Sequence, residues 1–425
     1  TCIALAYSLI GKHLVTVEGL AEGDRLHPVQ NAMVLENGSQ CGFCTPGFVM
    51  SLFALYHNEN NTNLAKINEA LSGNLCRCTG YKPIISAAFL AINKKNKEPL
   101  DFYKKNQKQL KEALVKLSDP KNISVSFAKG EKIINYDAPS NLEELSKVLS
   151  NNSSAKIVAA GTDLNLEITQ SMKEFPHLVS VNRVPELKSI SDNGADLEIG
   201  AAVSYEDAAS ILIGYWPDLD SFLQRFASLP IKNWATIGGN IANASPIGDM
   251  PPVLIALDAK LKLRKGSKVR IINLEEFFIS YKKTSLDESE FIESIIVPKP
   301  NDNERLITHK ISKRYEDDIS AVCMALKVTT KGSHPESVKI ALGGMSGIPQ
   351  RAIELEKVML ENWNNDEIVL ASYNALKSEF SPFSDVRASS EYRLRVTANL
   401  VKKSLLILKG LPLENLAHYS VASKL

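Results

Sequence analysis

Residues 40–47 read Gln-Cys-Gly-Phe-Cys-Thr-Pro-Gly, and residues 73–81 read Gly-Asn-Leu-Cys-Arg-Cys-Thr-Gly-Tyr. The first stretch holds a Cys-x-x-Cys pair and the second a Cys-x-Cys pair, with 31 residues between the two pairs. Paired thiols at such short spacing are typical of one metal site with four sulfur ligands. The pattern therefore predicts a metal centre held by Cys41, Cys44, Cys76 and Cys78.

Spacing alone favours iron and sulfur at this centre and leaves zinc or unrelated buried thiols as alternatives. Zinc sites usually combine two Cys-x2–4-Cys or His-x3–5-His pairs, and a Cys-x-Cys half is less usual. Each cysteine pair also precedes a stretch with helical periodicity, Pro46 to Tyr56 and Pro83 to Asn93. The positive ends of two helix dipoles would stabilise an anionic iron–sulfur cluster.

Length and composition exclude several classes of protein. A chain of 425 residues exceeds one ordinary core, so two to four domains are expected. The 49 basic and 48 acidic residues create no field that would attract nucleic acid or an anionic membrane, and the apolar runs are too short to span a bilayer. Six cysteines are too few for a disulfide-stapled secreted scaffold, so reduced thiols and a cytoplasmic location are predicted.

The composition and the apolar periodicity of the sequence change along the chain. The segment 21–96 predicts a compact helical unit, and 97–134 is rich in Lys and Asn and predicts a solvated linker. The segments 135–300 and 305–412 mix short β-branched runs with helical stretches, which is typical of α+β domains. In the second segment, helices are predicted around 353–362 and 391–408. Residues 413–425 are expected to form a frayed tail.

Two glycine-containing segments, 158–163 and 235–249, could bring backbone N–H groups close to a phosphate. Neither matches the dinucleotide fingerprint or the P-loop, and each by itself reads more simply as a tight turn. Because this chain also carries a predicted electron-transfer cluster, the two segments together make a flavin dinucleotide more plausible than either segment does separately.

The two cysteine stretches, together with 238–249, 314–318 and 342–347, resemble the molybdenum hydroxylases, most closely the iron–sulfur/FAD subunits of the xanthine dehydrogenase type. The resemblance implies a multidomain fold: an all-α four-helix [2Fe-2S] domain, an α+β FAD-binding domain of the vanillyl-alcohol-oxidase type and an α+β C-terminal flavoprotein domain. It implies that Cys41, Cys44, Cys76 and Cys78 hold a [2Fe-2S] cluster. Gln40 matches a residue that faces the pterin of the partner domain.

Cys2 resembles the last ligand of an N-terminal plant-type ferredoxin cluster whose other ligands are absent from this sequence. Residues 1–20 are therefore expected to be the remnant of that domain. The resemblance also implies the residues that surround FAD. These are Ile157, Val158, Ala159, Ala160, Gly161, Thr162, Asp163 and Leu164 around the pyrophosphate, Phe226 near the isoalloxazine ring, and Thr236, Ile237, Gly238, Gly239, Asn240, Asp249 and Lys310.

The function that the resemblance implies is electron transfer. A molybdopterin-binding large subunit would oxidise hypoxanthine or xanthine, and this chain would pass the electrons through [2Fe-2S] to FAD and then to NAD, in a heterotetramer or larger assembly. No catalytic residue for substrate hydroxylation is expected in this chain. The alternatives are a related hydroxylase that acts on an aldehyde, a heterocycle or CO, and, from another class, a zinc-stapled interaction protein.

Overall fold

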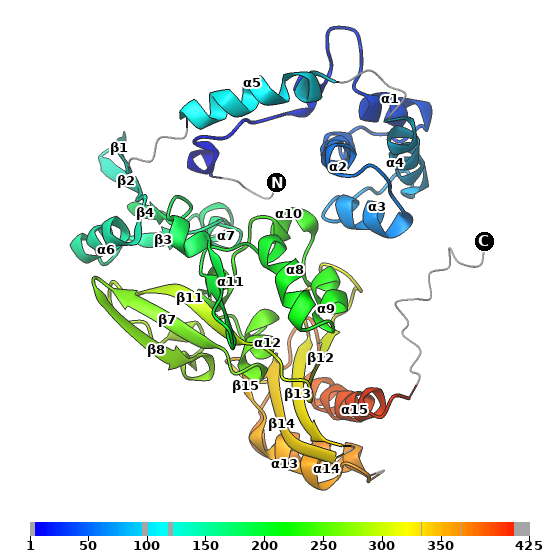
Figure 1. Ribbon diagram of the computed structural model, residues 1–425, viewed down its shortest axis with the longest axis vertical. Coiled ribbons are helices and arrows are strands. Elements are labelled where there is room, and N and C mark those ends of the chain that lie inside the picture. Colours follow the sequence, from blue (N-terminus) through cyan, green and yellow to red (C-terminus); the bar gives the residue numbers. More distant parts are fainter. Residues whose placement is uncertain (1–4, 96–100, 118–121, 333, 366, 412–425) are drawn as a thin grey trace. The chain divides into compact units, whose positions relative to one another are not determined.

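The structure is a computed structural model that describes residues 5–95, 101–117, 122–332, 334–365 and 367–411 (Figure 1). The chain divides into two compact units. The first, here called the helical unit, comprises Thr1–Lys121 and Ser228–Ile231. The second, here called the mixed unit, comprises Asn122–Ala227 and Lys232–Leu425. The sequence position of the division falls inside the predicted 97–134 linker.

The helical unit buries the apolar faces of four short helices around one core. Its elements are η1 (Ala6–Leu9), η2 (Val17–Leu20), α1 (Pro28–Leu35), α2 (Thr45–Asn58), α3 (Leu64–Leu71), α4 (Lys82–Lys94) and α5 (Phe102–Leu117). Val29, Phe48, Ile67 and Ile84 come from α1 to α4 in turn, and each is fully buried in this core. The all-α character predicted for the cysteine-bearing region is confirmed.

Polar side chains fix where these helices begin. The His27 ring accepts a hydrogen bond from the backbone N–H of Val29, and the backbone N–H of His27 donates to the Gln30 side chain. Asn63 accepts in the same way from the backbone of Lys66 at the start of α3. Such caps satisfy backbone donors that the first helical turn leaves without partners.

The segment 97–134 carries more regular structure than its lysine-rich composition suggests. It contains helix α5, strand β1 (Ile123–Lys129) and the start of β2 (Lys132–Ala138). Lysine, glutamine, leucine and alanine are good helix formers, so a charged composition does not prevent a helix when apolar side chains recur along one face. None of the described residues of α5 is buried.

The first part of the mixed unit holds two main sheets and, among its described residues, a separate two-stranded pair, β10-β9. The first sheet has the order β1-β2-β4-β3, in which β4 lies parallel to both β2 and β3, and the second has the order β5-β6-β11-β7-β8. The strands after β2 are β3 (Lys156–Val158), β4 (His177–Ser180), β5 (Ile190–Asp192), β6 (Asp196–Gly200), β7 (Lys260–Lys265), β8 (Lys268–Asn273), β9 (Phe278–Ser280), β10 (Lys283–Thr284) and β11 (Phe291–Pro298).

The helices that accompany these sheets follow or connect their strands. They are α6 (Leu142–Asn151), α7 (Leu164–Thr169), η4 (Pro185–Lys188), α8 (Tyr205–Tyr215), α9 (Leu219–Phe226), α11 (Ile237–Ala242), α12 (Met250–Ala256) and η5 (Leu274–Glu276). The short helix α10 (Leu229–Lys232) belongs, except for its last residue, to the helical unit. Apolar side chains of α8, α9, α11 and α12 share one buried cluster with those of the second sheet. This cluster is the larger core of the mixed unit.

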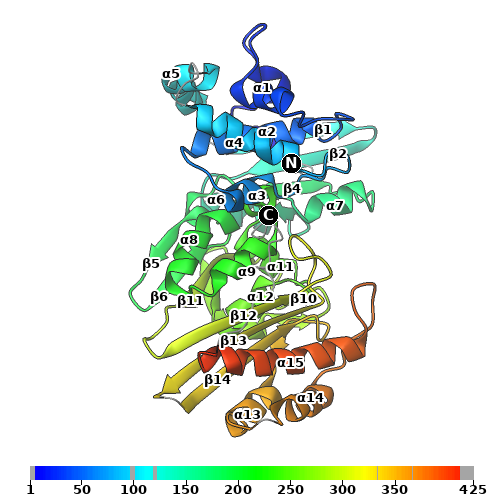
Figure 2. The same cartoon turned by 90° about the vertical axis from the view of Figure 1, so that its right-hand side faces the viewer.

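A third sheet, β12-β13-β14-β15, forms the C-terminal part of the mixed unit. Its elements are β12 (Glu304–Ile311), β13 (Val322–Lys331), β14 (His334–Gly343), β15 (Gln350–Arg351), α13 (Ile353–Glu361), α14 (Ile368–Glu379) and α15 (Ser390–Leu408). Alternate residues of β13 face opposite cores: Val322 and Met324 pack with the three helices, whereas Cys323 packs with the larger core. In Figure 2, α15 runs across this sheet. The α+β character of both predicted flavoprotein domains is confirmed.

Two features expected from the sequence lie outside the described residues, and one helix was not expected. Cys2 and the predicted tail 413–425 lie outside the described residues. Helix α14 has no counterpart in the sequence-based expectation, which placed helices only at 353–362 and 391–408 in this region. None of the helices in the described part of the chain is long and apolar enough to cross a membrane.

Candidate iron–sulfur and flavin sites

The four predicted cysteine ligands converge at one place in the helical unit. The sulfur atoms of Cys41 and Cys78 lie 3.6 Å apart, and the Cys44 and Cys76 thiols are hydrogen-bonded to each other. Two thiolates on one tetrahedral metal ion with bonds of about 2.3 Å are separated by roughly 3.7 Å. Cys76 is buried and Cys44 half-buried, whereas Cys41 and Cys78 are exposed. The donor set therefore fits a four-thiolate centre with one edge at the surface.

Helix starts and left-handed backbone positions shape this site. Helix α2 begins at the residue after Cys44, and α4 begins at Lys82, four residues after Cys78. Gly42 and Gly80 have φ of +83° and +69°, a region that side chains disfavour, so glycine lets each loop turn tightly beside the sulfurs. Tyr81 adopts φ of +67° even though it is not glycine, and its hydroxyl accepts the backbone N–H of Cys76.

Hydrogen bonds favour the thiolate form of one ligand. The Thr79 hydroxyl lies 3.1 Å from the Cys76 sulfur, and the backbone N–H groups of Thr79 and Cys78 donate to the same sulfur. Together these contacts lower the pKa of Cys76 to about 7, and the Thr79 hydroxyl has the largest effect. Burial has the opposite effect on Cys44 and raises its pKa. Thiolates are the form in which cysteine binds iron, so the Cys76 loop is prepared for metal binding.

The first glycine segment leaves the carboxyl end of strand β3. Residues 159–163 form a turn between β3 and α7, in which Gly161 has φ of +75°. A Cβ atom at Gly161 would lie 2.7 Å from the Asn165 side-chain amide, so this position tolerates no side chain without displacing Asn165. The predicted residues Ile157 to Leu164 thus make one compact turn with close backbone approach.

The second glycine segment forms the start of α11. The Thr236 hydroxyl accepts the backbone N–H of Gly239 at 3.0 Å and caps the helix. Gly238 lies directly on the Ala201 backbone, because an added Cβ would meet the Ala201 oxygen at 2.5 Å. Asn240 has a buried side-chain oxygen without a hydrogen-bond partner among the described residues. That oxygen is an acceptor available to a ligand.

Asp249 and Lys310, predicted from the resemblance, form a buried ion pair. The Lys310 Nζ atom lies 2.5 Å from Asp249 Oδ2 and donates to the Ser320 hydroxyl at 2.9 Å. The exposed fractions of the two side chains are 1% for Lys310 and 7% for Asp249. The other carboxylate oxygen, Asp249 Oδ1, is buried and has no hydrogen-bond partner among the described residues. An unpaired buried acceptor of this kind fits a bound group that donates a hydrogen bond.

Phe226 ends helix α9, and its ring packs against that of Tyr205 with centroids 4.5 Å apart. Tyr205 is fully buried, and burial, with a further contribution from the Asp249 charge, raises its pKa well above the usual value. Arg225, beside Phe226, donates to the Lys310 backbone oxygen at 2.9 Å. Phe226, Asp249 and Lys310 are therefore brought together around Tyr205.

The loop that follows β6 links the two glycine segments. The Ala201 oxygen accepts the backbone N–H of Gly238 at 3.0 Å. The next residue, Ala202, belongs to the cluster against which Ile157 and Ala159 pack. The two glycine segments thus contact consecutive residues of one loop of the mixed unit.

Sequence reasoning missed several residues of this region. Tyr205, Ala201 and Ser320 carry no motif, and their relevance comes only from contacts with Phe226, Gly238 and Lys310. Asn165 offered one signal, since it lies one residue beyond the predicted segment 157–164.

Three family models match consecutive parts of the chain. Residues 16–89 match a [2Fe-2S] binding domain, residues 131–300 the FAD binding domain in molybdopterin dehydrogenase, and residues 307–408 the CO dehydrogenase flavoprotein C-terminal domain. All four cysteine ligands lie within the first match. All predicted flavin residues except Lys310 lie within the second match.

Curated relatives include the xanthine dehydrogenase of Emericella nidulans and the xanthine dehydrogenase/oxidase of Rattus norvegicus. The first is 30% identical over 89% of this chain and 32% of its own length. The second is 31% identical over 86% of this chain and 31% of its own length. The chain thus spans about a third of the length of these relatives.

Solved structures similar to this chain include a carbon monoxide dehydrogenase from Hydrogenophaga pseudoflava. It aligns with a TM-score of 0.60 and 27% identity over 63% of this chain and 94% of that chain. Quinoline 2-oxidoreductase from Pseudomonas putida 86 aligns with a TM-score of 0.59 and 23% identity, over 65% of this chain and 96% of that chain, and shows the same fold.

Four converging thiols, followed along the chain by FAD-binding and flavoprotein C-terminal domains, define an iron–sulfur flavoprotein. The chain belongs to the molybdenum hydroxylases, as the iron–sulfur and FAD part of that family of oxidoreductases.

Proposed function

We propose that this chain carries electrons from a molybdenum centre on a partner subunit, through a [2Fe-2S] cluster, to FAD and then to NAD, in the oxidation of hypoxanthine or xanthine. When bound, the cluster carries single electrons and FAD collects the pair that NAD accepts as a hydride. The observation that carries the proposal is the convergence of Cys41, Cys44, Cys76 and Cys78 in a chain that also matches an FAD-binding domain.

The proposed cluster ligands are these four cysteines, and Cys2 is proposed as a ligand of a separate cluster. The proposed FAD contacts are the turn 157–164, Phe226, residues 236–240, Asp249 and Lys310. Backbone N–H groups of the 157–164 turn would donate to the pyrophosphate, because those of residues 237–240 already donate within the protein. The unpaired oxygens Asn240 Oδ1 and Asp249 Oδ1 would accept from the ligand.

The surface beside the thiols supports a partner at this place. Phe43, between Cys41 and Cys44, is 95% exposed, and Leu75, beside Cys76, is 66% exposed. Apolar side chains in such positions are typical of a protein interface. We assign this face, with Gln40, to the molybdopterin-binding partner. A heterotetramer or larger assembly in the cytoplasm remains part of the proposal.

The partner decides which substrate is oxidised, and this is the point of the most direct experiment. The chain, purified with the molybdopterin subunit, is expected to reduce NAD when xanthine is added. The likeness to carbon monoxide dehydrogenase and quinoline 2-oxidoreductase favours CO or a nitrogen heterocycle as the second candidate. If NAD is reduced with CO or with the heterocycle but not with xanthine or hypoxanthine, the proposed function becomes that of the related hydroxylase that acts on that substrate. Oxygen consumption without NAD reduction would refute NAD as the acceptor.

The turn at Gly161 provides a matched test of the flavin site. Gly161→Ala is expected to weaken FAD binding about tenfold, which corresponds to about 1.4 kcal/mol, because the new Cβ displaces Asn165 within the proposed pyrophosphate turn. Gly194→Ala is the control. Gly194 also has positive φ, +80°, but an added Cβ there meets no atom within 4 Å.

Both substitutions place alanine in the left-handed region, which costs about 1–2 kcal/mol. The measurement is the ratio of extracted FAD to protein and its dissociation constant by fluorescence. Equal flavin loss in the two variants would assign the effect to backbone strain and count against the 157–164 turn. Extraction of FMN in place of FAD would contradict the pyrophosphate assignment altogether.

A further inference from the structure

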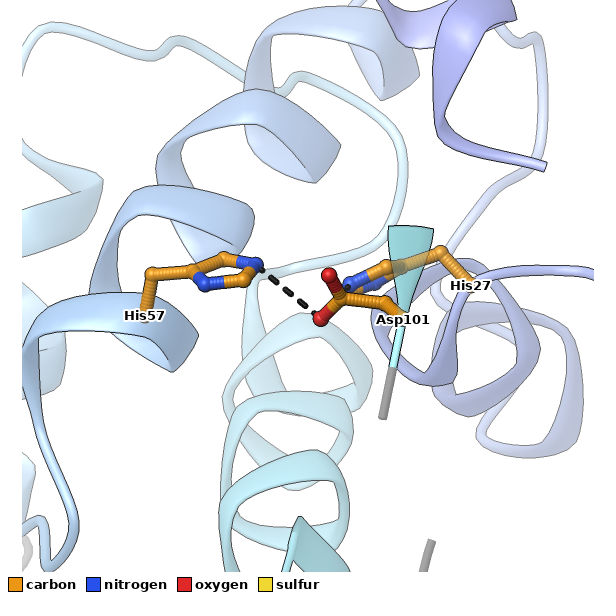
Figure 3. A group of neighbouring side chains, drawn as sticks. All are labelled: His27, His57 and Asp101. Atoms are coloured by element: carbon orange, nitrogen blue, oxygen red, sulfur yellow. Dashed lines mark hydrogen bonds and ion pairs between the residues drawn. The ribbon is translucent and has the colours of Figure 1, made fainter. Parts of the chain in front are cut away.

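Three side chains outside the proposed electron-transfer sites meet in the helical unit (Figure 3). His27 caps α1, His57 lies in the last turn of α2, and Asp101 directly precedes α5. Asp101 Oδ2 lies 3.3 Å from His27 Nε2 and 3.2 Å from His57 Nε2. His27 and Asp101 are only 2% and 6% exposed. One carboxylate thus contacts two helices and starts a third.

The two histidines and the aspartate match the donors of a small metal site, but the tautomer of His27 argues against one. His27 Nδ1 accepts the backbone N–H of Val29 at 3.2 Å, and a backbone amide can only donate. The neutral ring therefore carries its proton on Nε2, where it donates to Asp101. A metal ion at Nε2 would require both ring nitrogens to use lone pairs, which only an imidazolate can do. The cluster therefore combines the His27–Asp101 hydrogen bond with the close approach of His57 Nε2 to the same carboxylate oxygen.

Asp101 organises the first turn of α5 as well. Its second oxygen, Oδ1, accepts the backbone N–H of Lys104 at 2.9 Å and caps that helix. Tyr103 donates to the Gly19 backbone oxygen at 2.8 Å, and Lys105 pairs with Glu22 at 3.2 Å. These contacts all belong to the first turn, and no described residue of α5 is buried. Attachment of this helix thus combines the polar contacts around Asp101 with the packing of the Tyr103 ring against Phe53, centroids 5.3 Å apart.

We propose that His27, Asp101 and His57 form a proton-sensitive latch, which holds the first turn of α5 against the rest of the helical unit and releases it on acidification. A protonated His27 cannot accept the Val29 amide, and a protonated Asp101 keeps only one oxygen as a full acceptor, so it cannot serve both His27 and the Lys104 amide. Each protonation therefore removes a contact of the latch.

The pKa shifts of the three groups agree in sign. Burial lowers the pKa of both His27 and His57, and the Asp101 charge only partly offsets it. Burial raises the pKa of Asp101, but the Lys104 amide and the two histidines outweigh it, so its pKa lies below the usual value. A free histidine takes up a proton near pH 6.5, and the latched ones do so only at lower pH. The latch therefore keeps its full strength above about pH 6.5 and weakens as the pH falls.

Neighbouring positive charges also lower the pKa values of the two histidines. A cavity lies beside the cluster. Arg25 disfavours a proton on His27, and Lys95 and Lys104 disfavour one on His57. A cavity of about 340 Å³ borders the latch, and its lining comprises Leu20, Glu22, Asp24, Arg25, Leu26, His27, Pro28, Asn31 and Asp101. Of its acidic residues, Glu22 is paired with Arg25 and Lys105.

Hydrogen exchange of α5 in the full chain with its cofactors bound tests the latch. After correction for intrinsic exchange, the protection of the α5 peptides relative to those of α4 is expected to fall about tenfold or more between about pH 7 and pH 5. Asp101→Asn is expected to make α5 exchange fast at every pH, because an amide has one acceptor oxygen and cannot accept from both His27 and the Lys104 backbone N–H. Glu112→Gln, an exposed change on the same helix, is expected to behave like the unaltered protein.

Several outcomes would overturn the latch. One is a protection of α5 that does not change with pH, and another is unchanged protection in Asp101→Asn. Loss of protection in step with bleaching of the iron–sulfur and flavin absorption would mean general acid unfolding instead. If one equivalent of Zn²⁺ raised the protection of α5 in the unaltered protein but not in Asp101→Asn, the cluster would be a metal site.

Discussion

Replacing Cys44 by serine is expected to abolish the iron–sulfur absorption between about 400 and 550 nm and the [2Fe-2S] EPR signal, while bound flavin remains. A serine hydroxyl is a far weaker ligand for iron than a thiolate, so one missing sulfur leaves an iron atom undercoordinated. The flavin is retained because all its proposed contacts lie in the mixed unit, not in the helical unit. Xanthine-dependent NAD reduction in the complex is expected to disappear with the cluster, since the electron path is interrupted.

Cys323→Ala is the matched control for this experiment. Cys323 is fully buried in the mixed unit, and its thiol donates to the Asp249 backbone oxygen at 3.3 Å. Its removal takes away a thiol and leaves the cluster ligands intact, so the iron content is expected to stay unchanged. Loss of iron and flavin together in Cys44→Ser would indicate general misfolding. A Cys44→Ser protein that lacks iron but contains stoichiometric zinc would favour the zinc-stapled alternative.

Replacing Lys310 by methionine is expected to destabilise the mixed unit by about 3–5 kcal/mol, because it leaves the buried Asp249 carboxylate without its partner. The double variant Lys310→Met with Asp249→Asn is expected to recover much of this loss, since no uncompensated charge remains buried. The measurement is the free energy of unfolding by urea, with the cluster absorption of the helical unit as an independent probe.

A double-mutant cycle isolates the interaction between the two side chains. Destabilisation by Lys310→Met that simply adds to that of Asp249→Asn would show that the ion pair contributes nothing specific. Flavin content distinguishes the two roles proposed for this pair. If the double variant regains stability and still binds FAD poorly, the pair acts on the flavin site directly; full recovery of both would assign it to the fold alone.

Local patterns were sufficient to predict that the four thiols meet and where the two helices beside them begin. The Cys-x-x-Cys and Cys-x-Cys pairs lie in loops directly before α2 and α4, because proline and the periodic apolar residues that follow define both helix starts. The glycine segment at 236–240 was visible as a turn signal, although nothing local linked it to Lys310, which lies some seventy residues later. The role of the flavin residues could be proposed only from the resemblance.

Composition predicted 97–134 as a solvated linker, and no described residue of α5 within it is buried. Composition did not reveal the helix itself, which begins where Asp101 caps it and lies against two histidines from far earlier in the chain. No periodicity could pair Asp101 with His27 and His57. Similarly, nothing in the sequence marked Tyr205, whose position against Phe226 and near Asp249 depends on the packing of α8 and α9.

The sequence by itself predicted that four thiols meet in an all-α unit, because ligand spacing, helix starts and apolar periodicity are local properties. The tertiary structure alone decided which distant polar groups meet: Asp249 with Lys310, and Asp101 with His27 and His57. The physical reason is that an unpaired buried charge costs several kcal/mol of folding free energy, so it is paired in the folded protein. Its partner can lie far away in the sequence, and local patterns do not identify it.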